Sequence, residues 1–119
     1  MTYVDGFVIP IPQDKLPQYR SMAEAAGKIW MEHGALAFRE CVAEDTTAHE
    51  MIAFPKLAHA KDDETVLFSY IVFKSRQHRD EVNKKVMDDP RIKESCGQHG
   101  SWFDCKRMAY GGFDVLVDM

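Results

Sequence analysis

The chain has 119 residues, the size of one domain, and 45% of them are apolar and 29% charged, as in folded globular proteins. With a formal net charge of -4 and scattered basic residues, it lacks the clustered positive field of a nucleic-acid-binding protein, so nucleic acid is not expected as a partner. No apolar run reaches membrane-spanning length and the first residues do not resemble a secretory signal, so we expect a cytoplasmic protein without a membrane partner.

The first third of the chain predicts a strand followed by an amphipathic helix. Residues 3–11 are apolar or aromatic except for Asp5 and Gly6, and prolines end the run. Asp14 suits the N-cap of the helix and Gly34 suits its end. Between them, apolar residues recur at spacings of three and four: Leu16, Tyr19, Ala23, Ala26, Trp30 and His33.

The middle of the chain predicts a second strand and then a long excursion. In residues 35–42, Leu36 and Phe38 should face the side of the strand opposite to Arg39 and Cys41. Residues 44–63 are rich in acidic and turn-forming side chains, so we expect a loop with one short extended piece around residues 51–54.

The last part of the chain predicts strand, helix and strand. Ser75 should cap a helix that runs to residue 89, with three large apolar side chains, Val82, Val86 and Met87. A short helical turn over residues 91–96 and a loop over 97–104 then lead into a last strand, residues 105–117. Gly111 and Gly112 in this strand indicate a bulge or a close approach of another group.

Residues 66–73 are the longest run of β-branched and aromatic side chains, and seven of these eight are apolar or aromatic. Such a strand should be covered on both faces. The order strand, helix, strand, strand, helix, strand predicts an α+β protein with a ferredoxin-like βαββαβ fold, an antiparallel sheet and both helices on one face. The other face needs a second cover, so we expect a homodimer in which two sheets pack into an α/β barrel.

Five segments of the chain resemble a small uncharacterised bacterial family, the YbaA-like proteins, within the dimeric α/β-barrel superfamily. The segments are residues 3–7, 34–35, 63–66, 87–91 and 103–113. The last, Phe-Asp-Cys-Lys-Arg-Met-Ala-Tyr-Gly-Gly-Phe, is long enough to be specific, although Cys105 stands where a small residue such as glycine is expected. The resemblance implies a ferredoxin-like protomer and a homodimer over residues 1–119, and it implies no catalytic residues.

Polar side chains on the predicted strands are the candidate site for a small organic molecule. The hypothesis is that the protein binds this molecule, and its stronger form is that the protein also converts it. They are Asp5, Arg39, Tyr70, Arg107 and Tyr110. Asp5 would act as a base, an arginine would hold an anionic group, and a tyrosine would donate to a developing oxyanion. The alternative interpretation is structural: Asp5 pairs with an arginine, the tyrosine hydroxyls are satisfied at a dimer surface, and the protein is an interaction homodimer without catalysis.

Histidine and cysteine spacing predicts neither a metal site nor a cofactor. The five histidines show no paired ligand spacing, and His78 is expected to be solvated. The three cysteines are too widely spaced for a disulfide framework; we expect Cys41 to be buried, and Cys96 and Cys105 to be more accessible.

An RNA-binding protein is the remaining alternative, because the same strand order builds the RNA-recognition motif. Phe68, Tyr70 and Phe73 match the aromatic positions of its third strand. The basic residue and glycine that open this motif are missing, so we expect these aromatic rings to pack in a core.

Overall fold

A computed structural model describes residues 1–95 and 102–119. Four strands form one antiparallel sheet in the order β2-β3-β1-β4, which agrees with the ferredoxin-like strand order. The strands are β1 (Tyr3–Pro12), β2 (Ala37–Val42), β3 (Glu64–Phe73) and β4 (Ala109–Asp114). The helices are α1 (Leu16–Glu32), α2 (Phe54–Leu57), α3 (Arg76–Met87) and α4 (Pro90–Ser95). The α+β class is confirmed.

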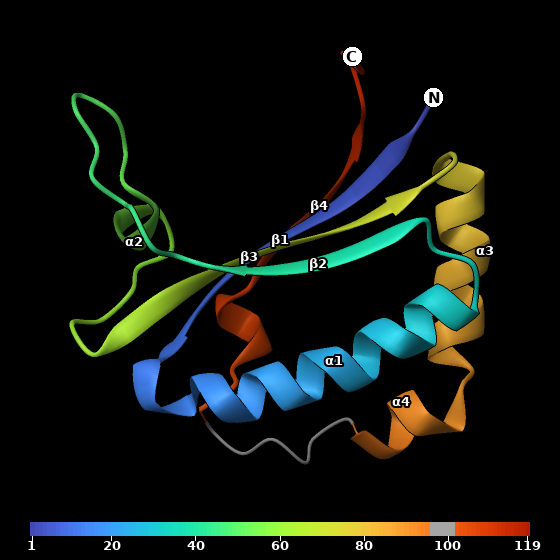
Figure 1. Ribbon diagram of the computed structural model, residues 1–119, viewed down its shortest axis with the longest axis horizontal. Helices are drawn as coiled ribbons and strands as arrows, with labels where there is room; N and C mark the ends of the chain where they lie inside the picture. The colour runs from blue at the N-terminus through green and yellow to red at the C-terminus, as the bar shows by residue number, and fades with distance from the viewer. Residues whose placement is uncertain (96–101) are drawn as a thin grey trace.

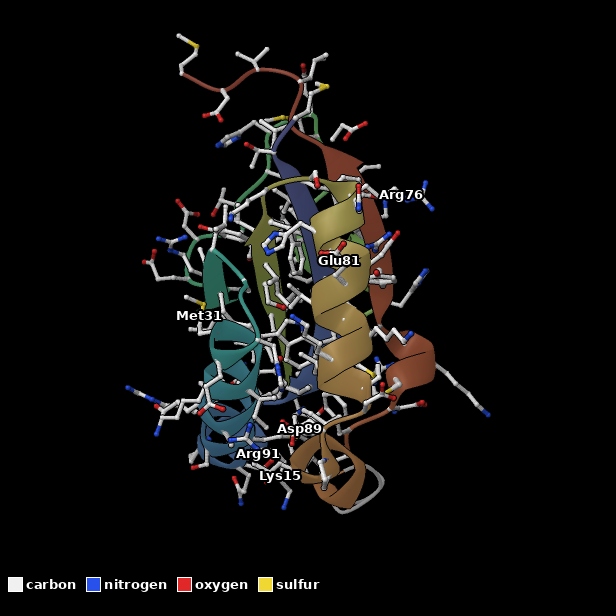
Figure 2. The ribbon with its side chains drawn as sticks, turned by 90° about the vertical axis from the view of Figure 1, so that its right-hand side faces the viewer. Lys15, Met31, Arg76, Glu81, Asp89 and Arg91 are labelled. Atoms are coloured by element: carbon white, nitrogen blue, oxygen red, sulfur yellow. The ribbon has the colours of Figure 1, made fainter. Side chains whose placement is uncertain are left out.

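The two long helices cover one face of the sheet and leave the other open. In Figure 1, α1, α3 and α4 all lie on the same side, while α2 and the two termini extend to the other side. The C-terminal end of α1 lies beside α3 (Figure 1), and Figure 2 shows Asp89 and Arg91 close together just beyond the C-terminal end of α3. Within the described residues, no helix is long and apolar enough to cross a membrane.

The core lies between the sheet and these helices and is built from alternate residues of the two central strands. Ile9, Ile11 and Phe73 are almost fully buried there, and Val82 and Val86 of α3 pack against the same layer. One side of each central strand thus lies in the core, under the helices that were predicted to cover one face of the sheet.

The opposite side of the sheet remains partly exposed. Phe68 on β3 and Phe113 on β4 face away from the helices, and they are 44% and 59% exposed. Tyr70 and Val72 share this face of β3. The central strand is thus apolar on both sides, and the described residues cover its second side only in part.

Two predicted helix signals are confirmed and one is wrong. Gly34 has φ +113° just beyond α1, and the Ser75 hydroxyl accepts a hydrogen bond from the His78 amide at the start of α3. Asp14, however, lies inside a 3-10 turn (Gln13–Lys15), and Lys15 is the residue that precedes α1. With Asp14 as the N-cap, the third helical residue would be Pro17, which has no amide hydrogen to donate to the cap.

Two further expectations need correction. No strand forms around residues 51–54, because Phe54 begins α2 and Pro55 stands in its first turn, where proline is favoured. The last strand is shorter than predicted: Asp104 accepts the Lys106 amide and starts a 3-10 turn (Cys105–Arg107) before β4.

Candidate functional site

A groove of about 920 Å³ runs between α1 and the edge strand β2. It exists because β2 is the edge of the sheet formed by the described residues, while α1 crosses close to this edge. Small residues permit the approach: Gly27 lies so close to Phe38 that a Cβ there would sit 2.8 Å from the ring. The lining is mostly apolar, with Leu16, Met31, Phe38 and Leu67 among its residues.

A hydrogen-bonded pair forms the polar part of this apolar groove. The Tyr19 hydroxyl donates to Oε1 of Glu40 over 2.8 Å, and the buried Ser69 is a further hydrogen-bond partner of both side chains. Burial raises the pKa of the Glu40 carboxyl, against the opposing effect of the two hydroxyl groups. Burial and then the neighbouring Glu40 raise the pKa of Tyr19.

A second, smaller cavity of about 180 Å³ lies behind the groove, toward Trp30 and Met108. Tyr19, Phe38 and Glu40 line both spaces. The hydrogen-bonded Tyr19 and Glu40 therefore lie between the groove and the smaller cavity. A ligand in the groove would thus meet a mostly apolar lining with the hydrogen-bonded pair in it and charged side chains of α1 along its border.

Asp5 lies under α3, away from the groove, in a network of donors. Its side chain is 1% exposed and accepts from Arg79 Nη1 over 2.9 Å and from Asn83 Nδ2 over 3.3 Å. Arg79 Nη1 also donates to the Tyr110 hydroxyl over 2.7 Å, and Trp30 Nε1 donates to Asn83 Oδ1. The structural alternative for Asp5, a pair with an arginine, is confirmed, and the pair ties α3 to the sheet.

The other three candidate residues lie elsewhere. Arg39 and Tyr70 meet on the open face of the sheet, with the guanidinium carbon 5.7 Å from the ring centroid. Arg107 donates to both oxygens of Glu64 over 2.7 and 2.8 Å and to the His59 carbonyl oxygen. The structure thus brings four of the five residues together as two separate pairs, Asp5 with Tyr110 through Arg79 and Arg39 with Tyr70, and ligand binding by the five residues stays a prediction.

Histidine and cysteine positions follow from the same geometry. His78 accepts the Lys74 amide hydrogen at Nδ1, and the described ranges hold no group of three or more potential metal ligands. Cys41 is exposed, contrary to expectation, because it lies on the edge strand and faces the uncovered side of the sheet. Cys105 is exposed as predicted. Cys96, like most of the predicted loop 97–104, lies outside the described residues.

The aromatic residues that match an RNA-recognition motif divide between the two faces of β3. Phe68 and Tyr70 lie on the open face, so their predicted place in a core is wrong for this chain alone. Phe73 is fully buried under the helices.

A family model described as a protein of unknown function (DUF1428) matches residues 2–105 of the chain. The chain belongs to this family. Proteins named "Uncharacterized protein YbaA" from Escherichia coli strain K12, Escherichia coli O157:H7 and Shigella flexneri are each 43% identical over 118 residues, which cover 99% of this chain and 99% of each relative. The YbaA-like resemblance is therefore confirmed, while neither the DUF1428 description nor these names assign an activity.

The most informative polar residues of this DUF1428 chain were missed by strand-by-strand reasoning. Glu40 has the same parity as Phe38 on β2, so it had to share the helix-facing side, and Ser69 interrupts the apolar central strand. These two signals were readable. Tyr19 was treated only as part of an apolar stripe, and the partner of Asp5, Arg79, lies 74 residues away.

Proposed function

We propose that this chain binds a small organic molecule in the groove between α1 and β2. Ligand pockets in proteins usually have volumes of roughly 300–1,000 Å³ and a mostly apolar lining with few polar groups. The groove, at about 920 Å³, fits this description. Its walls come from a long helix and a strand, which hold side chains more firmly than loops do.

The observation that carries the proposal is the Tyr19–Glu40 pair. The Glu40 carboxyl and the Tyr19 hydroxyl satisfy each other's hydrogen bonding in a mostly apolar lining. Both residues line the groove and the second cavity. Polar groups placed in an apolar lining are the usual source of orientation and specificity in a ligand site.

A thermal-shift screen against a metabolite panel tests this proposal. A ligand present at 100 times its Kd stabilises the folded protein by about 2.7 kcal/mol, which a melting curve resolves. Val42 lines the groove and is partly exposed, so Val42→Trp should fill the groove without disturbing the core. Val117→Trp, in the exposed C-terminal tail, is the control. A ligand should stabilise the wild type and the control but not Val42→Trp; no shift with any compound, or equal shifts in all three proteins, contradicts the proposal.

We also propose that the open face of the sheet packs against a second copy of the chain, giving a cytoplasmic homodimer of ferredoxin-like protomers that form an α/β barrel. Phe68 and Phe113 on this face support it, because monomeric proteins rarely expose extended apolar patches. The net charge of -4 favours a protein partner over RNA for the same aromatic residues. If the groove binds no ligand, the same assembly would be a structural homodimer without catalysis.

Light scattering at micromolar concentration tests the dimer. The wild type should have twice the mass of the 13.6 kDa chain. Phe68→Arg should give the single-chain mass, while Met87→Arg, an exposed position at the end of α3, should leave the dimer intact. A wild type with the single-chain mass removes this part of the proposal.

A further inference from the structure

Glu40 is a carboxyl whose described partners are hydroxyl groups and not cations. Tyr19 and Ser69 hydrogen-bond to it, and no salt bridge among the described residues includes it. Glu40 lies on the edge strand and is still exposed to solvent, and the enclosure of part of its carboxyl without a cation favours the uncharged form. The strand and the helix thus hold a carboxyl whose charge depends on how much water reaches it.

Other charged groups border the groove from α1 and β2. On α1 the charged groups are Arg20, Glu24, Lys28 and Glu32. On β2 the residues next to Glu40 are the charged Arg39 and the titratable Cys41. Arg20 pairs with Glu24 over 3.1 Å, and Glu32 pairs with Arg91 over 2.7 Å. Among the described residues that line the two cavities, none is a histidine. Glu40, a carboxyl without a cation partner among the described residues, is therefore the group of this lining best placed to take up a proton when a ligand fills the groove.

We propose that the ligand of this groove is an uncharged, largely apolar molecule with a carbonyl oxygen, and that Glu40 takes up a proton on binding and donates it in a hydrogen bond to that oxygen. This inference rests on the groove being the ligand site. The apolar lining suits an aliphatic or aromatic body. Tyr19 donates to Oε1 of Glu40, so a proton taken up at the other carboxyl oxygen gives Glu40 an O–H group that can donate to the ligand.

Proton uptake follows from the filling of the groove. An apolar ligand displaces water from the exposed part of Glu40, which further disfavours the carboxylate. The balanced step is carboxylate plus one proton from solvent, giving a neutral carboxylic acid bonded to the ligand carbonyl. By linkage, affinity then falls as pH rises through the pKa of unliganded Glu40, by up to about tenfold per pH unit.

Calorimetric titration of the full chain with 2-octanone from pH 5 to 8 tests this inference. The wild type should bind more weakly as pH rises, and titrations in phosphate and imidazole buffers should show uptake approaching one proton. Glu40→Gln keeps a hydrogen-bond donor but cannot titrate, so its Kd should not change with pH. Glu44→Gln, an exposed acid just beyond β2, should keep the wild-type profile.

A second variant separates a proton-transfer role from a merely structural one. Tyr19→Phe removes the donor that stabilises the ionised form of Glu40, so its pH profile should move to higher pH. A pH-independent Kd in the wild type, a pH-dependent Kd in Glu40→Gln, or tighter binding of octylamine than of 2-octanone would overturn the inference and leave the groove as a site. If neither probe binds and the metabolite panel also gives no shift, both proposals fail.

Discussion

Replacing Asp5 by asparagine should destabilise the fold strongly, because the carboxylate is buried beneath a buried guanidinium. Asp5 is 1% and Arg79 13% exposed, and their atoms are 2.9 Å apart. Removing one member of a buried ion pair costs roughly 3–5 kcal/mol, since the other charge is left without compensation. Arg79 keeps bonds to Tyr110 and Asp80, so we expect the lower value, about 3 kcal/mol.

The control is another carboxylate bonded to the same guanidinium. Asp80 accepts from Arg79 Nε over 2.8 Å but is 56% exposed, so Asp80→Asn should cost less than about 1 kcal/mol. Combining Asp5→Asn with Arg79→Met removes both buried charges and should recover part of the loss seen in Asp5→Asn, as a double-mutant cycle would show.

Urea unfolding at one protein concentration, followed by tryptophan fluorescence, is a suitable assay. Trp30 donates to Asn83, which in turn donates to Asp5, so the fluorescence reports on the region that changes. A loss of about 3 kcal/mol corresponds to a fall in melting temperature of roughly 12 °C for a chain of this size. If Asp5→Asn costs no more than Asp80→Asn, the argument that this pair holds α3 to the sheet is refuted.

Three further predictions concern other parts of the molecule. Gly27→Ala should destabilise by about 1 kcal/mol, because the clash with Phe38 outweighs the gain in helix propensity, and a result of net stabilisation in urea would contradict the close packing. Arg107 lowers the pKa of Glu64 from 4.5 to about 2. This pair therefore stabilises the fold fully above the pKa of Glu64 in the unfolded chain, and the stabilisation is lost as pH falls through the pKa of Glu64 in the folded protein. Glu64→Gln should reduce the pH dependence of the unfolding free energy in that window by about 1.5–3 kcal/mol. An unchanged profile would argue against the pair. In a Cys96→Ser background, the dimer should protect Cys41 on the open face from a maleimide while Cys105 reacts freely, whereas equal rates at high protein concentration would count against face-to-face packing.

Much of the fold was predictable because it depends on short-range patterns. The apolar and aromatic runs of β1 and β3 were visible as strands because such side chains favour the extended backbone of a sheet. Gly34 and Ser75 act within one turn of their own helix, so the neighbouring sequence is enough to predict their roles. Asp14 failed because the 3-10 turn after Pro12 moved the start of the helix, and only the packed chain shows that turn.

The candidate site was predictable only in part because a groove needs elements that are distant in sequence. Asp5 was expected to pair with an arginine, but the partner depended on how α3 lies on the sheet. The importance of Glu40 depends on Tyr19 reaching it from α1, 21 residues away. Parity could place Glu40 on the helix-facing side, yet it could not show that the edge of the sheet leaves a space beside it.

The most direct test of the account is to map ligand binding residue by residue by NMR. Compounds that raise the melting temperature would be added to ¹⁵N-labelled protein, and amide resonances would be followed through the titration. We predict shifts concentrated at Tyr19, Gly27 and Glu40, the walls of the groove. Saturable shifts confined instead to Arg39 and Tyr70 on the open face would contradict the claim that the groove between α1 and β2 is the ligand site.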